Sequence, residues 1–304
     1  MENSMKTCFI GATSFLGNSF ANFFLNQNIN ISVFGRSKPQ FPCEEFYPID
    51  LNNENFSFSE FLKYDIIYYF AGEGIQSDKG YSLKNLYNVN LFKIIEICDY
   101  LNKNSFNGIL ISFGSYSEIG PILPNVKQNE EEIIFSKSIL PNDYSKSKRL
   151  LTTFIQSSKF NFKIYHLIIP TIYGPGENPN RLIPYLIRKG KNNETIFLTH
   201  GNQIRQYLFV NDIPEIVNNM ISLNIQSGIY NIEGPDNYSV KDLAIMILKY
   251  FSFDLNLIRF GTIQKWDSEM NCLKLDGSKL SNLLGDTKKK GLIEILPKYY
   301  EYYQ

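Results

Sequence analysis

The sequence predicts an α/β protein whose parallel β-sheet is covered by helices on both faces. Through the first half of the chain, short apolar runs alternate with amphipathic segments of helical length. Such alternation is typical of successive β-α-β units. Two of the runs, Ile66–Phe70 and Ile109–Ile111, are continuously apolar, as expected of parallel strands that are buried on both faces.

We expect six strands and four helices in this half. The strands are Thr7–Ile10, Ile31–Gly35, Phe46–Ile49, Ile66–Phe70, Gly108–Ser112 and Phe162–Ile169. The helices are Phe15–Asn26, Phe56–Leu62, Leu83–Leu101 and Tyr144–Lys159. After Pro170 proline and glycine cluster, and irregular segments with short helices follow. We therefore expect a first domain over residues 1–170, to which part of 205–235 returns, and a smaller second domain over 171–304 that closes over it.

Composition and charge limit the classes of function and partner. A chain of 304 residues with 43% hydrophobic content can bury one large or two small cores. The 30 basic and 30 acidic side chains balance, which predicts neither nucleic acid nor a membrane surface as partner. No apolar run is long enough to span a bilayer. Together with four scattered cysteines, read as reduced thiols, this predicts a cytoplasmic protein without a metal site.

Only two histidines are present, His166 and His200, which disfavours zinc and Ser-His-Asp chemistry. His166 lies within the apolar run Ile164–Pro170. We expect it to be a hydrogen-bonded core residue and not a catalytic one.

A glycine-rich turn follows the first predicted strand directly. Gly11 and Gly17 hold its outer positions, and Ser14 takes the middle one. Glycines in such a turn let the backbone approach a pyrophosphate, whose charge the N-terminus of the next helix stabilises. We therefore expect a Rossmann-type, doubly wound sheet that binds a dinucleotide here, with Ser14 donating its hydroxyl to a phosphate. The expected contacts are Gly11, Ser14, Phe15, Leu16 and Gly17.

The end of the second predicted strand indicates which dinucleotide is bound. An acidic residue there would accept a hydrogen bond from the ribose of NAD(H). This chain instead has Arg36, Ser37 and Lys38, which suit the extra phosphate of NADP(H). A solvated basic loop is the alternative explanation. NADP(H) is thus favoured, and NAD(H) stays possible.

Three residues in order along the chain form a candidate catalytic group. Tyr144 and Lys148 are four residues apart, so both lie on one helical face. With 20 tyrosines in the chain, this spacing alone indicates little. Ser115 adds to it, because a hydroxyl at the carboxyl end of a central strand lies where open α/β sheets bind ligands. A nearby ammonium is expected to lower the pKa of the tyrosine and make it a proton donor or acceptor.

With these motifs the chain resembles the extended short-chain dehydrogenase/reductases, in particular the NAD-dependent epimerase/dehydratase family that acts on nucleotide sugars. The resemblance covers nearly the whole chain. Further matching segments are Asp50-Leu51, Phe70-Ala71-Gly72, Asn88-Val89-Asn90, Pro170–Gly176, Gly201–Tyr207, Val210-Asn211-Asp212, Tyr230–Gly234 and Leu275–Leu280. Departures are Ser14 for the central glycine, Gln206 for an aspartate and Thr171 for an asparagine.

The resemblance implies roles for individual residues. Ser115, Tyr144 and Lys148 would be catalytic. Further cofactor contacts would be Asp50, Leu51, Phe70, Ala71, Gly72, Asn88, Tyr144, Lys148, Pro170 and Ile172. The substrate, a nucleotide-diphosphate sugar, would contact Ser115, Tyr116, Thr171, Arg181 and Arg205. Arg205 would grip the diphosphate, although a surface arginine is the alternative explanation.

The resemblance also implies a homodimer with a four-helix interface, made by the segments Leu83–Leu101 and Tyr144–Lys159. Apolar residues of the first segment could form the seam, although core packing explains them equally well. These residues are Leu86, Val89, Ile94, Ile97 and Leu101.

The choice of reaction depends on the residues after Ser115. Related 4,6-dehydratases carry an Asp-Glu pair there, and one branch of epimerase-reductases carries a cysteine, whereas this chain has Tyr116 and Ser117. Reduction or reversible epimerisation at C4 remain. The basic segment at Arg36 favours NADPH-dependent reduction of a 4-keto-(6-deoxy) nucleotide sugar. The alternatives are a 4-epimerase with tightly bound NAD and, as a minor one, a non-catalytic cofactor-binding scaffold.

Overall fold

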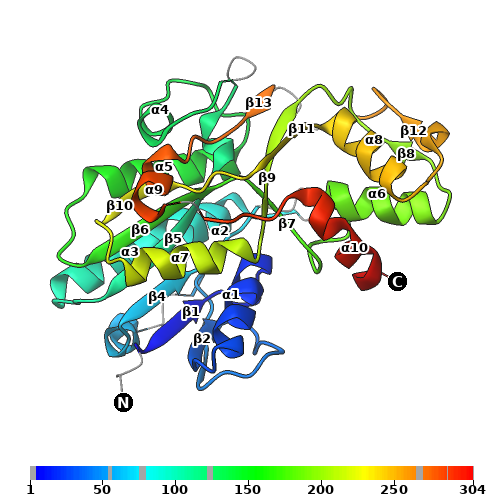
Figure 1. The fold of residues 1–304 in the computed structure, drawn as a ribbon. Helices are drawn as coiled ribbons and strands as arrows, with labels where there is room; N and C mark the ends of the chain where they lie inside the picture. The colour runs from blue at the N-terminus through cyan, green and yellow to red at the C-terminus, as the bar shows by residue number, and fades with distance from the viewer. Residues whose placement is uncertain are drawn as a thin grey trace.

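A seven-stranded, fully parallel sheet forms the centre of the larger part of the molecule (Figure 1). The computed structural model describes residues 5–53, 57–74, 80–121, 126–264, 270–285 and 287–303. The strand order is β10-β6-β5-β4-β1-β2-β3, which confirms the predicted Rossmann-type, doubly wound fold. The strands are β1 (Thr7–Ile10), β2 (Ile31–Gly35), β3 (Phe46–Pro48), β4 (Ile66–Tyr69), β5 (Ile109–Ser115), β6 (Lys163–Ile169) and β10 (Gly228–Asn231).

Strand β5 continues three residues beyond its predicted end at Ser112. It pairs with β6 up to the partners Ser115 and Ile169, so the ladder of hydrogen bonds extends to the carboxyl edge of the sheet. Ser115 is therefore the last residue of a central strand.

Helices cover both faces of this sheet (Figure 1). Phe56, where one helix was predicted to begin, lies outside the described residues, and the rest of that segment forms the short 3₁₀ helix η1 (Phe58–Lys63). The predicted helix Leu83–Leu101 is helical throughout, but one turn near its middle is a π-helix instead of an α-helix. One face carries η1, α2 (Leu83–Tyr87), the π-turn η2 (Asn88–Phe92), α3 (Lys93–Lys103) and α5 (Asp143–Ser157), and the other α1 (Phe15–Asn26) and α7 (Asp212–Ser222).

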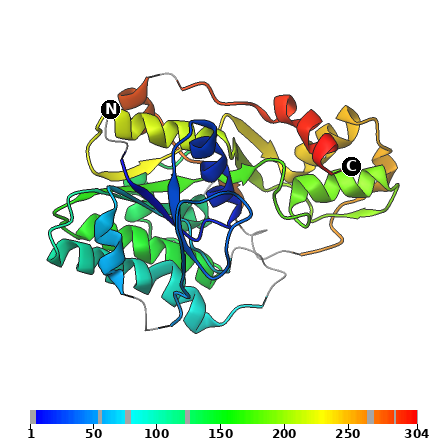
Figure 2. The same ribbon diagram turned by 90° about the horizontal axis from the view of Figure 1, so that it is seen from below.

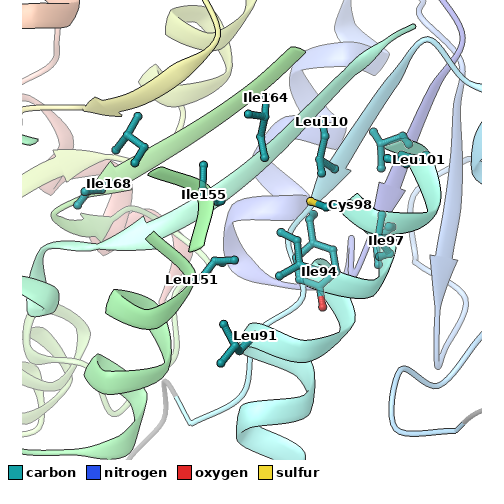
Figure 3. Close-up of a cluster of buried hydrophobic side chains, with 14 of the residues drawn as sticks. Leu91, Ile94, Ile97, Cys98, Leu101, Leu110, Leu151, Ile155, Ile164 and Ile168 are labelled. Atoms are coloured by element: carbon teal, nitrogen blue, oxygen red, sulfur yellow. The ribbon is translucent and has the colours of Figure 1, made fainter. Parts of the chain in front are cut away.

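Alternate residues of each strand enter different cores, as the two-residue period of a strand requires. In β1, Cys8 and Ile10 face α3 and α5, whereas Phe9 faces α1 in an aromatic cluster with Phe24 and Tyr68. Figure 3 shows the side chains of α3 and α5 directed at the strands of the sheet. The residues proposed as an interface seam, Leu86, Val89, Ile94, Ile97 and Leu101, are all buried within the chain, so core packing is the correct explanation for them.

A second part of the chain forms a lobe beside the large sheet (Figures 1 and 2). Its four-stranded sheet was missed by the sequence analysis because its strands are only two to six residues long. The strands are β7 (Thr171–Tyr173), β9 (Ile204–Phe209), β11 (Asp236–Ser239) and β13 (Cys272–Leu273). A third core joins β7 and β9 to α6 (Leu182–Lys191), α8 (Val240–Tyr250) and α10 (Leu292–Tyr302), beside the small pair β8 (Ile196–Phe197) and β12 (Ile258–Arg259).

The segment 205–235 is divided between the two sheets. Strand β9 lies in the small sheet, whereas α7 and β10 belong to the large one. Shorter elements complete the chain: η3 (Tyr116–Ile119), α4 (Glu130–Ile134), η4 (Leu255–Leu257) and α9 (Ser278–Leu284), which packs against β10.

The cysteines and His166 are in the states that the sequence predicts. All four cysteines are free, and His166 is completely buried between two hydroxyl partners. No helix in the described ranges has the length and apolar character needed to cross a bilayer.

Strands β1 and β4 lie side by side although they are not consecutive, so the chain reverses its winding between them. Ligands of open α/β sheets bind at such a switch point. Gly11, which follows β1, has φ of +79° and lies so close to the loop after β4 that a Cβ atom would be 2.8 Å from the Ala71 backbone. Only glycine satisfies both conditions.

We expect Gly11→Ala to destabilise the protein by two separate costs. The left-handed backbone costs about 1–2 kcal/mol, and the clash with Ala71 adds about 1–3 kcal/mol. Gly285→Ala is the matched control, because Gly285 has φ of +74° and no atom within 4 Å of the added methyl. Urea unfolding should give a larger loss for Gly11→Ala. Equal losses would contradict the close approach.

Candidate active site

The three candidate catalytic residues meet at the carboxyl edge of the large sheet. Ser115 ends β5, and Tyr144 and Lys148 lie in the first two turns of α5. The Ser115 hydroxyl lies close enough to Tyr144 to lower the pKa of the phenol. The Nζ atom of Lys148 lies 6.0 Å from the centre of the Tyr144 ring and donates to the main-chain carbonyl of Phe113 at 2.8 Å. The structure thus brings the predicted trio together on one side of the strand end.

The acidity of Tyr144 differs from the sequence expectation. Loss of water around the hydroxyl raises its pKa to about 12, and the nearby Ser115 hydroxyl and the charge of Arg181 offset part of this rise. The Lys148 ammonium does not lower the pKa below the ordinary value, because it is buried and donates to Phe113, and burial lowers its own pKa. Tyr144 therefore holds its proton at neutral pH and is suited to donate it.

The glycine-rich turn leads into α1 at the switch point. The Oγ atom of Ser14 accepts a hydrogen bond from the Gly17 amide at 3.1 Å and caps the helix. This contact leaves the hydroxyl proton of Ser14 free to point elsewhere. Phe15 is half-buried and Leu16 is buried, both packed in the core under α1. A helix N-terminus next to the Gly11 turn fits the pyrophosphate of a dinucleotide.

Other predicted cofactor residues surround this turn at the ends of neighbouring strands. Asn88 donates to the Leu51 carbonyl at 2.8 Å, and Asp50 accepts from the Asn52 amide at 3.0 Å. Together these bonds fix the loop after β3. The remaining residues are Arg36 and Ser37, exposed after β2, and Phe70, Ala71 and Gly72, which follow β4 from the buried core out to the surface.

Asn90 is a site residue that the sequence analysis assigned no role. Its side chain is buried, accepts from the Glu73 amide at 2.8 Å and donates to the Glu73 carbonyl at 3.0 Å. It also donates to Ser147 Oγ of α5 at 3.0 Å. Asn90 therefore fixes the loop after β4 relative to the helix that carries Tyr144. The signal available in the sequence was its place in the segment Asn88-Val89-Asn90, which matches the family pattern.

Two residues predicted to contact the substrate, Tyr116 and Thr171, are joined directly after Ser115. The Tyr116 hydroxyl and Thr171 Oγ1 are hydrogen bonded, which joins η3 to β7. Pro170 is buried and Ile172 is half-buried in the same stretch. Thus Tyr116 and Thr171 form one wall beside the catalytic trio.

Arg181 is held in place by a buried carboxylate. Its Nε atom lies 3.1 Å from Oε2 of Glu177, and Oε1 of the same carboxylate accepts a hydrogen bond from Tyr299 of α10. Tyr299 in turn accepts from the Gly174 amide at 2.6 Å. Arg181 remains about one-third exposed and close enough to Tyr144 for its charge to act on that hydroxyl.

Arg205 is buried and is therefore not a surface arginine. Its Nη1 atom donates to the main-chain carbonyls of Ile204 and Met270 at 2.8 and 2.7 Å. The neighbouring Gln206, where the family pattern has an aspartate, is also buried. Its amide accepts from the Leu275 amide at 3.3 Å and donates to the Leu275 carbonyl at 3.2 Å. At this position a neutral amide side chain therefore hydrogen bonds to both main-chain groups of Leu275.

Comparisons with known proteins point to nucleotide-sugar enzymes. CDP-abequose synthase of Salmonella muenchen is 26% identical over 106 residues, which are 34% of this chain and 36% of the relative. GDP-6-deoxy-D-talose 4-dehydrogenase of Aggregatibacter actinomycetemcomitans is 26% identical over 178 residues, 57% of this chain and 60% of the relative. The matches thus span from about a third to three-fifths of these relatives.

A solved structure with the same fold and a match to a family model both point to the same family. DesIV, a dTDP-glucose 4,6-dehydratase from Streptomyces venezuelae solved with NAD and TYD bound, superposes with a TM-score of 0.83 at 17% identity. The superposition covers 98% of this chain and 97% of DesIV. The model of the family described as "NAD dependent epimerase/dehydratase family" matches residues 8–232. The chain belongs to the NAD-dependent epimerase/dehydratase family.

Proposed function

We propose that this protein reduces the C4 keto group of a 4-keto-(6-deoxy) nucleotide-diphosphate sugar with NADPH. The observation that carries this proposal is the meeting of Tyr144 and Lys148 of α5 with Ser115 at the end of the central strand, with Tyr144 holding its proton at neutral pH. A reduction needs a proton donor beside the carbonyl oxygen. The second relative is named as a 4-dehydrogenase of a 6-deoxy sugar nucleotide, which is the same redox change at the same carbon.

The residues present fit a nicotinamide dinucleotide. The Gly11 turn and the N-terminus of α1 would hold the pyrophosphate, Arg36 and Ser37 the 2′-phosphate, and Lys148 the hydroxyls of the nicotinamide ribose. When bound, NADPH supplies a hydride to the substrate carbon.

The remaining steps belong to side chains of this chain. Ser115 would donate a hydrogen bond to the carbonyl oxygen of the substrate, and Tyr144 would give its proton to the alkoxide as it forms. Arg181 and Arg205 would bind the diphosphate and hold the sugar in register with these groups. The positive charge of Arg181 also favours the tyrosinate that forms when Tyr144 gives up its proton.

Residue 116 argues against dehydration. A 4,6-dehydratase needs an acid and a base after the catalytic hydroxyl, whereas Tyr116 in this chain is hydrogen bonded to Thr171 and Ser117 donates to Ser115 Oγ at 3.0 Å. A 4-epimerase with retained NAD is the second candidate, favoured by the NAD bound in DesIV. A non-catalytic scaffold is disfavoured because the trio is intact.

We also propose a homodimer. Its interface would be formed by exposed apolar residues and not by the buried ones that the sequence suggested. Three exposed apolar side chains, Leu83, Phe92 and Leu150, line a surface groove of about 650 Å³. They come from α2, η2 and α5, the segments expected at the interface. Two copies related by a two-fold axis would remove these side chains from water on both partners at once.

Replacement Tyr144→Phe tests the catalytic proposal. Without the hydroxyl, no proton reaches the alkoxide, and kcat for NADPH-dependent reduction of 4-keto-6-deoxy nucleotide sugars should fall about 100- to 10,000-fold. Cofactor affinity, measured by NADPH fluorescence, should stay within about twofold because the ring remains. Tyr250→Phe on the exposed face of α8 is the control. Undiminished turnover in Tyr144→Phe would rule out its proposed role.

Replacement Arg36→Ala tests the cofactor preference. Loss of a charged hydrogen bond of about 1.5–3 kcal/mol should weaken NADPH binding about 10- to 100-fold and leave NADH binding unchanged. Arg188→Ala removes an exposed arginine from α6 and should change neither affinity. If purified wild type instead carries near-stoichiometric, non-exchangeable NAD, the 4-epimerase is the better assignment.

Replacement Leu150→Glu tests the dimer. A carboxylate in the apolar groove would have to be desolvated at the interface, so light scattering should show a monomer where the wild type is a dimer. Ile293→Glu places the same charge on a similarly exposed apolar position of α10 and should leave the dimer intact. If Leu150→Glu and Ile293→Glu have the same molar mass in solution, this interface is contradicted.

A further inference from the structure

Beneath Ser115 lies a buried polar network that the proposed mechanism does not use. Its members are Ser112, Glu118, Thr152 and His166, and none is accessible to solvent. They come from β5, η3, α5 and β6, so the network joins all the elements that surround the catalytic serine. Burying so many polar groups is costly unless each is satisfied.

Glu118 is the centre of this network. One carboxylate oxygen accepts from the main-chain amide of Ser115 at 2.7 Å, and the other accepts from Thr152 Oγ1 at 2.5 Å. Residue 114 has to be glycine for this arrangement, since a Cβ atom there would lie 2.7 Å from the carboxylate and 2.9 Å from His166 Nε2. The carboxylate thus occupies the space left by a missing side chain.

Counting protons gives the direction of each hydrogen bond. The Thr152 hydroxyl has one proton, and when Glu118 is ionised this proton goes to the carboxylate. His166 Nε2, 2.9 Å from the same hydroxyl, must then carry a proton and donate it. His166 Nδ1 accepts from Ser112 at 2.8 Å. This requires a neutral imidazole, and burial indeed lowers the pKa of His166 to about 3.

The charged and titratable groups that face Glu118 come mainly from α5. Lys148 and Arg149 carry positive charge, and Arg149 also donates from Nε to the Glu118 main-chain carbonyl at 2.8 Å. Tyr144 is the third group from α5, and neutral His166 faces Glu118 from β6. Burial raises the pKa of Glu118 and lowers that of Lys148, and each charge opposes the shift of the other.

We propose that Glu118 is a positioning residue for the active site, whose carboxylate fixes the Ser115 main chain and interacts with the charge of Lys148. Thr152 and His166 hold the carboxylate in this orientation. The proposal rests on the proposed function for the roles of Ser115 and Lys148. In the sequence, this role corresponds to a glutamate three residues after the serine. The two residues form a capping box at the start of η3.

Replacement Glu118→Gln removes the charge but retains an acceptor for the Ser115 amide. We expect kcat to fall about 10- to 100-fold with little change in KM. A second measurement needs no sugar substrate: the affinity for NADH or NADPH, whichever the wild type binds more tightly, from about pH 7 to about pH 10. Without the carboxylate Lys148 loses its proton more readily, so cofactor binding should weaken at a pH lower by roughly one unit.

The chain offers a matched control in a second capping box. Glu132 accepts from the Asn129 amide at 2.8 Å in the same geometry, but it is exposed and lies on α4. Glu132→Gln should leave kcat and the pH dependence of cofactor binding unchanged. A wild-type pH dependence in Glu118→Gln, or an equal effect of Glu132→Gln, would overturn the proposal.

If Glu118→Gln does not fold, the variant Thr152→Val can be tested in the same cofactor titration. Loss of the hydroxyl removes a hydrogen bond that favours the ionised carboxylate, so cofactor binding should weaken at a pH between those of wild type and Glu118→Gln. No shift in Thr152→Val would overturn the proposal in that case. A wild type that reduces no nucleotide sugar would instead refute the proposed function, while the cofactor titration still decides the role of Glu118.

Discussion

The hydrogen bond from Lys148 to the Phe113 carbonyl joins α5 to the end of β5, and the geometry of the candidate active site depends on it. Apolar side chains of α5, Leu151 and Ile155, pack on the same face of the sheet and supply most of the free energy that holds the helix there. Packing alone would leave the helix able to slide or rotate slightly. A buried ammonium that must find an acceptor removes this freedom, because an unpaired charge in the core is far more costly than a small change in packing.

Other loops around the site are fixed in the same way, each by one buried polar side chain. Asn90 holds the loop after β4, Glu118 holds the turn after β5, and Glu177 holds Arg181 and α10. Each of these side chains bonds to segments that are distant in the chain or to main-chain groups without partners in a helix or strand. Water is largely excluded at these points, which strengthens each interaction. The loops that form the site are therefore positioned by specific bonds and the elements behind them by apolar packing.

The large sheet could be predicted from the sequence because its strands are buried on both faces and read as continuous apolar runs. The trio could be predicted because a strand end and a helical spacing are local patterns. The small sheet could not, since β11 has the sequence Asp-Asn-Tyr-Ser and is a strand only through its pairing with β9. The burial of Arg205 was also invisible, because its carbonyl partner Met270 comes from 65 residues away.

The acidity of Tyr144 shows why a motif does not by itself fix chemistry. The spacing to Lys148 suggested a lowered pKa, but the effect of a charge depends on what else that charge interacts with. Here the ammonium is buried and donates to the Phe113 carbonyl, and desolvation of the phenol outweighs the other effects on its pKa. A tyrosine that keeps its proton is a better acid than base at neutral pH. For the proposed reduction that is the useful state, because a developing alkoxide would be a much stronger base than tyrosinate and would take the proton from Tyr144.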